Sequence, residues 1–325
     1  MTDSQQMYRT LMTAFCTHIS HAIFGDVRRL MVLAWAVIGL CFTKTVSFDL
    51  WGEVVISQAQ YASSHNRRFQ RWFHNPHIRP IKFYYPLFRA ALRTWDAAET
   101  MYLALDASDL PNSYILIRLS LIYRGRSVPV TWRVIRHNGT SVGYQHYKGL
   151  LAQARVILPA AARVVLLADR GFVHAELVKW LRQAGWSYRL RAKSSTLVRL
   201  PDRRVLNMAQ LWPPKGHAHC YQGVQILGEH IGPVHLVGAN PAAEGEEPWY
   251  IITNDPADVT TLADYARRFD IEENFLDDKS NGFQVESTKL DDATAIARLF
   301  LVLAVATLHL TSVGVAVVQQ QPAAG

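Results

Sequence analysis

Residues 163–172 read RVVLLADRGF, an apolar run that ends at Asp169 and turns through Arg170-Gly171-Phe172 into a helical stretch. A continuous run of aliphatic residues is typical of a strand buried on both faces, as in a parallel sheet covered by helices. An isolated Asp after such a strand is most often a turn or helix-capping residue. The stretch therefore predicts an α/β fold and leaves the role of Asp169 open.

The flanking sequence predicts further elements of the same sheet. Residues 101–105 form a short apolar run that ends at Asp106. Residues 114–123 and 127–135 are rich in β-formers and joined by Arg124-Gly125-Arg126, which predicts a hairpin. Helices are expected at 144–158 and 173–184, and a strand at 187–193. Because Asp106 and Asp169 each follow a central strand, the two carboxylates can converge at one edge of a mixed sheet.

The rest of the chain divides by composition. Residues 195–248 are rich in Pro, Gly and His and contain short β-like pieces, which predicts an inserted β subdomain. Residues 249–253 (WYIIT) predict a return to the sheet, followed by a helix from about 260 to 280. We expect a helical domain at 1–95, a catalytic core at 96–194 and 249–325, and the insertion at 195–248.

Four polar residues share one face of the helix expected at 260–280. With about 100° per residue, their side chains fall within an arc of about 60°. The four are Tyr265, Arg268, Glu272 and Lys279. A solvated face would more usually mix charges in i,i+4 pairs. Glu272 can join Asp106 and Asp169 in binding two hard divalent cations, while the basic side chains can hold phosphates.

The N-terminal part has a basic segment suited to a polyanion. Residues 65–93 contain seven Arg and Lys residues and no acidic one, interleaved with aromatic residues. Arg67, Arg68 and Arg71 lie in its first turns and are candidate phosphate contacts. The whole chain carries a formal charge of +8, which favours the same class of partner. The alternative is a solvated helix face with a core behind it.

The signature Tyr265-x2-Arg268-x3-Glu272-x6-Lys279 resembles the Y-R-E-K motif of the insertion-sequence-four family of DDE transposases. Asp169-Arg170-Gly171-Phe172 resembles that family's second-aspartate motif, and Leu105-Asp106 resembles its first. The resemblance covers about residues 100–318, and more loosely residues 65–75.

The resemblance implies an RNase H-like mixed sheet with an inserted β subdomain and an N-terminal all-α DNA-binding domain. It implies that Asp106, Asp169 and Glu272 hold two Mg²⁺ or Mn²⁺ ions. Water would cleave the phosphodiester at each transposon end, and the freed 3′-hydroxyl would join target DNA. Double-stranded DNA with inverted-repeat ends is the implied partner, bound by a dimer in a synaptic complex.

The resemblance also assigns DNA contacts by position. Tyr265, Arg268 and Lys279 would hold phosphates near the scissile bond. Trp249 fits the place of a family Trp that stacks on a flipped base, with a buried core Trp as the alternative. Arg191 and Lys193 match a basic strand that touches DNA, with a solvated edge as the alternative.

Several features limit or compete with this interpretation. Asp109 is a less favoured first ligand, because it lies past the expected end of the strand. An inactive DNA-binding relative and an RNase H-like nuclease that cleaves without joining are the main rivals. The uncharged run at 299–318 is long enough to span a bilayer, but a helix buried against a sheet fits it better, so no membrane partner is expected. Some family members carry a further C-terminal domain that pairs two subunits, and its lack here leaves the mode of dimerisation open.

The expected compartment follows from cysteine usage and the N-terminus. Three scattered cysteines exclude a disulfide framework and fit a reducing environment. The polar N-terminus lacks the basic start and apolar run of a secretory signal. With the resemblance, this predicts a cytoplasmic, nucleoid-associated bacterial protein.

Overall fold

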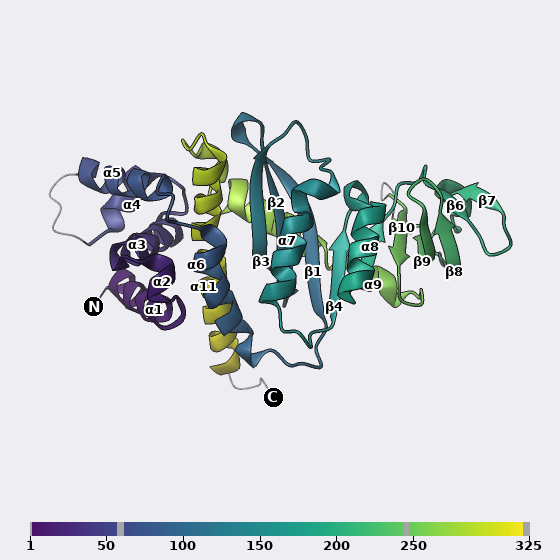
Figure 1. The fold of residues 1–325 in the computed structure, drawn as a ribbon, viewed down its shortest axis with the longest axis horizontal. Helices are drawn as coiled ribbons and strands as arrows, with labels where there is room; N and C mark the ends of the chain where they lie inside the picture. Colours follow the sequence, from purple (N-terminus) through teal and green to yellow (C-terminus); the bar gives the residue numbers. More distant parts are fainter. Residues whose placement is uncertain (1, 57–61, 244–246, 321–325) are drawn as a thin grey trace.

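The computed structural model describes residues 2–56, 62–243 and 247–320 of the chain. Six helices come first and gather at one end of the molecule (Figure 1). They are α1 (Asp3–His18), α2 (His21–Phe24), α3 (Val27–Thr43), α4 (Phe48–Val54), α5 (Ala62–Phe73) and α6 (Pro80–Ala91). The expected all-helical N-terminal part is therefore present.

Ten strands form one mixed sheet. In chain order they are β1 (Met101–Leu110), β2 (Tyr114–Tyr123), β3 (Arg126–Arg136), β4 (Val164–Ala168), β5 (Ser187–Arg191), β6 (Leu197–Arg199), β7 (Val205–Asn207), β8 (Ala218–Ile226), β9 (Ile231–Ala239) and β10 (Trp249–Thr253). Their order in the sheet is β3-β2-β1-β4-β5-β10-β9-β8-β6-β7.

The first five strands have the RNase H-like arrangement. Strands β1, β2 and β3 form an antiparallel meander, while β4 and β5 run parallel to β1. The hairpin expected from residues 114–135 is β2–β3, and the run at 163–168 is the buried central strand β4. The predicted α/β fold class is confirmed.

The insertion does not form a sheet of its own. Strand β10 pairs antiparallel with β5 on one side and with β9 on the other. Strands β8, β6 and β7 then continue outward from β9 (Figure 1). The inserted strands therefore extend the central sheet, because β10 presents a second edge for hydrogen bonding once it has paired with β5.

Helices cover both faces of the first strands. On β3, Thr131 bonds to the carbonyl of Leu150 in α7 (Tyr144–Ile157), and the next residue, Trp132, bonds to the carbonyl of Ala297 in α11 (Ala293–Gln320). Since successive strand residues point to opposite faces, α7 and α11 lie on opposite sides of the sheet. Helix α8 (Ala175–Ala184) packs beside α7 (Figure 1).

Helix α11 joins the sheet to the N-terminal helices. It packs against β3, α3 and α6, and residues 299–306 are buried. Its Arg298 side chain bonds to the carbonyls of Phe73 and Ile78, at the end of α5 and just beyond it. Over residues 293–317 this helix is long and apolar enough to cross a membrane, a property that the core helix of a soluble protein shares.

The packing of α3 on α4 makes a prediction about stability. A Cβ added to Gly39 would lie 2.5 Å from Cγ of Trp51, which is fully buried and fixed by a bond from its Nε1 to the carbonyl of Thr45. We expect Gly39→Ala to destabilise the fold by about 1–3 kcal/mol through overpacking. Urea unfolding measures this.

Gly149→Ala is the matched control for this substitution. Gly149 lies on the exposed face of α7, with nothing within 4 Å of an added Cβ. Alanine there should stabilise the fold by roughly 0.5–1 kcal/mol through helix propensity. Equal effects at the two positions would contradict the close packing of α3 on Trp51.

Candidate active site

The parallel pairing of β1 with β4 brings two carboxylates together. The register pairs Leu105 with Ala168, so the next residues along, Asp106 and Asp169, lie side by side. Neighbouring strands are about 4.8 Å apart, which sets the scale of the separation between the two backbones. The convergence predicted from the two apolar runs is a consequence of this register.

Strand β1 is longer than predicted. It runs on to Leu110 because residues 106–110 pair with β2, so Asp106 lies within the strand and not at its end. Asp109 also lies in the strand, and it is exposed. Asp106 and Asp109 are three residues apart in one strand, so their side chains point to opposite faces of the sheet.

The single helix expected at 260–280 is interrupted. It consists of α9 (Thr260–Ala266), α10 (Phe269–Leu276) and a π-helical segment, Asp277–Asn281. Backbone bonds from Arg268 to Tyr265 and from Ile271 to Arg268 are of the tighter i→i+3 type. The helical period therefore changes twice along the signature, and a constant angle per residue does not describe it.

Arg268 lies between two of the three carboxylates. Its Nη1 is 2.9 Å from Oδ2 of Asp106, and its Nη2 bonds to Oε1 of Glu272 one turn later in α10. Its Nε donates to the hydroxyl of Tyr265 at 3.1 Å. The guanidinium is 3% exposed, so its charge is balanced by these carboxylates and not by water.

Asp169 is tied to the same group through Tyr265. The Tyr265 hydroxyl donates to Oδ1 of Asp169 at 3.4 Å, and Nη1 of Arg191 lies 3.9 Å from the same oxygen. Tyr265 is fully buried. Asp106, Asp169 and Glu272 thus belong to one network with Arg268 and Tyr265, although they come from β1, the end of β4 and α10.

The electrostatics of the site are dominated by Asp106. Burial raises the pKa of Asp106 to about 6, and the nearby charges of Glu272 and Asp169 act in the same direction. The guanidinium of Arg268 opposes this rise. Burial also raises the pKa of Tyr265 to about 12, so its hydroxyl stays protonated and can donate to Asp169.

The three carboxylates fit divalent cations of the hard class. Their ligand atoms are all oxygen, which Mg²⁺ and Mn²⁺ prefer. A cationic group already lies between Asp106 and Glu272, so these two carboxylates face a common space.

A second buried ion pair, which the sequence analysis missed, anchors the helix that carries Glu272. Arg118 on β2 bonds to Asp278 of the π-helical segment, and both side chains are at most 3% exposed. The Arg118 guanidinium also lies 4.2 Å from the ring centroid of Phe275 in α10. The available signal was a lone Arg in the apolar run YILIRLSLIY, since a buried charge needs a partner.

A third set of buried polar contacts holds α9 in place. Asp264, next to Tyr265, accepts from the hydroxyl of Tyr102 at 2.6 Å and from Nη2 of Arg189 at 3.1 Å. Arg189 also bonds to Asp255 in the turn after β10. These contacts fix the position of Tyr265 relative to β1 and β5.

Of the other predicted DNA contacts, Trp249 and Arg191 contact residues of this network, whereas Lys193 and Lys279 have no described contact with it. Trp249 is half-buried at the start of β10, with ring centroids 5.3 Å from Tyr265 and 5.8 Å from Phe269. Arg191 bonds to Glu247 at 2.9 Å, and Lys193 is exposed beyond β5. Lys279 belongs to the π-helical segment, and its Nζ lies 4.0 Å from Oε1 of Glu286.

The basic residues of α5 lie on the N-terminal helices. Arg67, Arg68 and Arg71 are exposed, while Phe69 and Phe73 of the same helix are buried. The helix therefore presents a basic face to solvent and an apolar face to the core.

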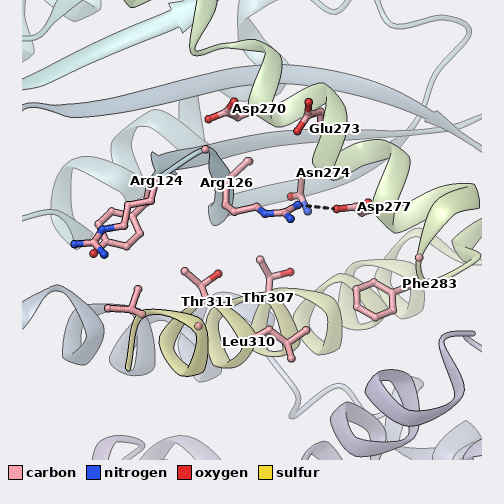
Figure 2. Close-up of a pocket in the computed structure, with 16 residues that line it drawn as sticks. Arg124, Arg126, Asp270, Glu273, Asn274, Asp277, Phe283, Thr307, Leu310 and Thr311 are labelled. Carbon is pink, nitrogen blue, oxygen red and sulfur yellow. Dashed lines mark ion pairs between the residues drawn. The ribbon is translucent and has the colours of Figure 1, made fainter. Parts of the chain in front are cut away.

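A cavity on the far side of α10 is a separate feature. It has a volume of about 520 Å³ and is lined by Arg126, Glu273 and Asp277, and by residues of α11 that include Thr307 and Leu310 (Figure 2). Arg126 lies 3.5 Å from Asp277. None of the three site carboxylates is among the described residues of its lining.

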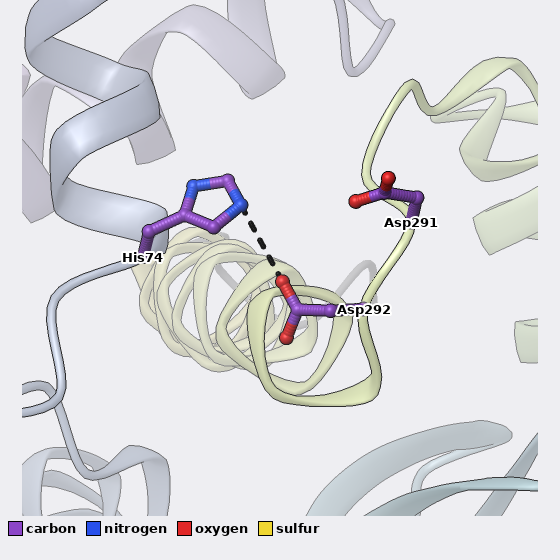
Figure 3. A group of neighbouring side chains, drawn as sticks. All are labelled: His74, Asp291 and Asp292. Carbon is purple, nitrogen blue, oxygen red and sulfur yellow. Dashed lines mark ion pairs between the residues drawn. The ribbon is translucent and has the colours of Figure 1, made fainter.

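One further group of possible metal ligands lies near the N-terminal helices. His74, Asp291 and Asp292 have ligand atoms within 4.8 Å of one another, and His74 pairs with Asp292 at 3.4 Å (Figure 3). Asp292 also accepts bonds from the backbone N–H groups of Thr294 and Ala295 at the start of α11. Helix capping and an exposed ion pair account for this group.

Comparisons with known proteins agree with part of this description. The family described as "Transposase DDE domain" matches residues 110–308, a range that includes Asp169 and Glu272 and begins just after Asp106. The cryo-EM structure of a piggyBac transposase synaptic complex with hairpin DNA is similar at 11% identity, with a TM-score of 0.44. That similarity covers 94% of this chain, which spans 65% of the other chain. No curated protein matches the sequence.

The burial of Asp106 predicts how stability depends on pH. Because its pKa is raised from 3.8 to about 6, the folded chain keeps a proton near pH 5 that the unfolded chain has lost. The resulting stabilisation is complete below about pH 4 and is lost as pH rises through about 6, a change on the order of 3 kcal/mol. Urea unfolding of wild type and Asp106→Asn between pH 4 and 8 should show this extra decline in the wild type alone.

Asp109→Asn provides the control, since Asp109 is exposed on the other face of the same strand. This variant should keep the wild-type dependence on pH. A wild-type profile parallel to that of Asp106→Asn would mean that Asp106 is not buried as described.

Proposed function

Because the chain belongs to the Transposase DDE domain family, we propose that it is a DNA transposase that cleaves phosphodiesters at transposon ends and joins them to target DNA. Hydrolysis at each end breaks the bond to the 3′-oxygen and leaves a 3′-hydroxyl. That hydroxyl attacks a phosphodiester of the target and displaces its 3′-oxygen. In a hairpin pathway, the first attack falls on the opposite strand of the same end.

One observation carries the proposal. Asp106 and Asp169 lie side by side on paired parallel strands, and Glu272 reaches the same space from a helix packed on that sheet. The three carboxylates carry more negative charge than the single guanidinium of Arg268 can balance, which favours binding of a further cation. The arrangement is what the resemblance to the insertion-sequence-four family leads us to expect.

The roles of the site residues follow from their positions. Asp106, Asp169 and Glu272 would hold two Mg²⁺ or Mn²⁺ ions, which when bound polarise the phosphodiester and activate the attacking group. Arg268 supplies a planar fork that can grip a phosphate. Tyr265 orients Asp169 and Arg268, since it is buried between them.

DNA would extend from this centre over basic surfaces. We assign phosphate contacts to Arg191, Lys193 and Lys279 around the site. Arg67, Arg68 and Arg71 would contact the duplex from the N-terminal helices, with residues 1–95 acting as the DNA-binding domain. Two copies of the chain, each holding one inverted-repeat end, would form the synaptic complex.

The three carboxylates are expected to be required for cleavage. Asp106→Asn, Asp169→Asn and Glu272→Gln should each reduce metal-dependent cleavage by at least about 10³-fold, while duplex affinity measured in EDTA stays within about threefold of wild type, since the change removes charge but little volume. A labelled duplex carrying the element's inverted repeat, incubated with Mg²⁺, Mn²⁺ or EDTA, measures both quantities. Glu273→Gln is the matched control. Glu273 faces the cavity in Figure 2, so the protein with this substitution should cleave DNA normally.

The same experiment separates the rival functions. Specific binding without cleavage in the wild type would indicate a repurposed DNA-binding relative. Cleavage without joining to a target duplex would indicate a nuclease. Wild-type cleavage by any of the three carboxylate variants would remove that residue from the site.

Trp249 is expected to act in the hairpin step. Its half-buried ring lies beside Phe269, which is 37% exposed, so a flipped base can reach an aromatic surface there. Trp249→Ala should slow hairpin formation about tenfold or more while changing first-strand nicking by less than threefold, because base stacking contributes about 1–3 kcal/mol. Equal losses in both steps, measured on denaturing gels, would instead assign Trp249 to the core.

A further inference from the structure

We propose that Arg268 couples the binding of divalent cations to the binding of DNA. In the free protein its guanidinium fills the space between Asp106 and Glu272, and a DNA phosphate draws it away to open that space. This proposal rests on the proposed function, and it adds an order of assembly in which the complete metal site forms only on DNA.

The guanidinium of Arg268 bridges two of the site carboxylates. Arg268 uses a different nitrogen for each carboxylate, Nη1 for Asp106 and Nη2 for Glu272, so its guanidinium spans the gap between them. A Mg²⁺ ion held by both carboxylates would need their oxygens at about 2.0–2.1 Å, which the intervening guanidinium prevents. The two cations therefore compete for the same oxygens.

The positive charge of Arg268 opposes the binding of a cation beside it. A divalent cation beside a guanidinium that is 3% exposed would repel it at close range in a poorly solvated environment. If the cation displaced Arg268 from the carboxylates without offering another anion, an uncompensated buried charge would remain, which is strongly unfavourable. Cation binding in the free protein is therefore weakened by the cost of moving Arg268.

An aromatic side chain that is partly exposed lies beside the Arg268 guanidinium. The guanidinium carbon lies 5.2 Å from the ring centroid of Phe269, whose side chain is 37% exposed beside Trp249. In the proposed switch, the Arg268 side chain rotates past this ring to the surface. A phosphate there offers it the bidentate partner that it loses in Asp106 and Glu272.

The consequence is a thermodynamic linkage. If DNA moves Arg268 and thereby strengthens cation binding, cation binding must strengthen DNA binding by the same factor. Couplings of this kind usually amount to about 5- to 150-fold. Without DNA, the chain would be protected from holding active metal ions.

The test measures Mn²⁺ binding directly, by the loss of the electron paramagnetic resonance signal of free Mn²⁺. The full chain is titrated alone and with a duplex that carries the inverted repeat and a phosphorothioate at the cleavage position. Glu272→Gln with the same duplex supplies the background of Mn²⁺ bound by DNA. Wild type should bind Mn²⁺ at least about fivefold more tightly with the duplex than without it.

Arg268→Gln should remove the coupling. Without DNA it should bind Mn²⁺ at least about fivefold more tightly than wild type, because no cation competes for the carboxylates, and DNA should give no further increase. Arg268→Lys, which keeps the charge, should retain part of the coupling. Arg267→Gln is the matched control, since this exposed neighbour lies over the ring of Tyr102 and should behave as wild type.

Two outcomes would overturn the proposal. One is equal Mn²⁺ affinity of wild type with and without DNA, which needs no variant to measure. The other is Mn²⁺ binding by a folded Arg268→Gln variant that is no tighter than wild type. Failure of the proposed function looks different, because Asp106→Asn would then bind Mn²⁺ as wild type does in every condition.

Discussion

The parallel register between β1 and β4 is the constraint on which the site depends. It fixes Asp106 and Asp169 at adjacent positions, and a shift of one residue would turn one carboxylate to the opposite face of the sheet. Both strands are central, with β2 on one side and β5 on the other, so the register is held by hydrogen bonds along two further edges. The chemistry is thereby built on the most rigid part of the fold, while Glu272 is brought to it by packing.

That packing relies on buried charge. Arg118 and Asp278 join the sheet to the segment that follows Glu272, and Arg268 joins Glu272 to Asp106. Buried ion pairs of this kind contribute little net stability, because desolvation offsets their attraction, but removing one partner is costly. They therefore act chiefly to specify where α10 lies. The two arginines differ in their aromatic neighbours, since Arg118 lies over Phe275, which is 7% exposed, whereas Arg268 lies near Phe269, which is 37% exposed.

The strands could be predicted from the sequence wherever the pattern of apolar residues alone determines the secondary structure. The run at 164–168 has no polar position, which is typical of a strand covered on both faces, and β2–β3 follows from two β-rich stretches around Arg124-Gly125-Arg126. The site was harder because its geometry is set by departures from regular structure. Strand β1 continues past Asp106 since β2 offers partners for it, and the signature helix changes period at Arg268 and again at Asp277. Neither event leaves a mark in hydrophobic periodicity.

The same limit explains why the partner of Arg268 could not be read from its spacing. On a regular helix, Tyr265, Arg268 and Glu272 form a stripe that faces outward to a ligand. In the structure Arg268 is buried and meets a carboxylate that lies 162 positions earlier in the chain. A charge pattern in one helix shows which groups are available, but the sheet decides whether a cation binds phosphate or carboxylate. The order of assembly proposed above uses this difference, because the same guanidinium would exchange its carboxylate partners for a DNA phosphate.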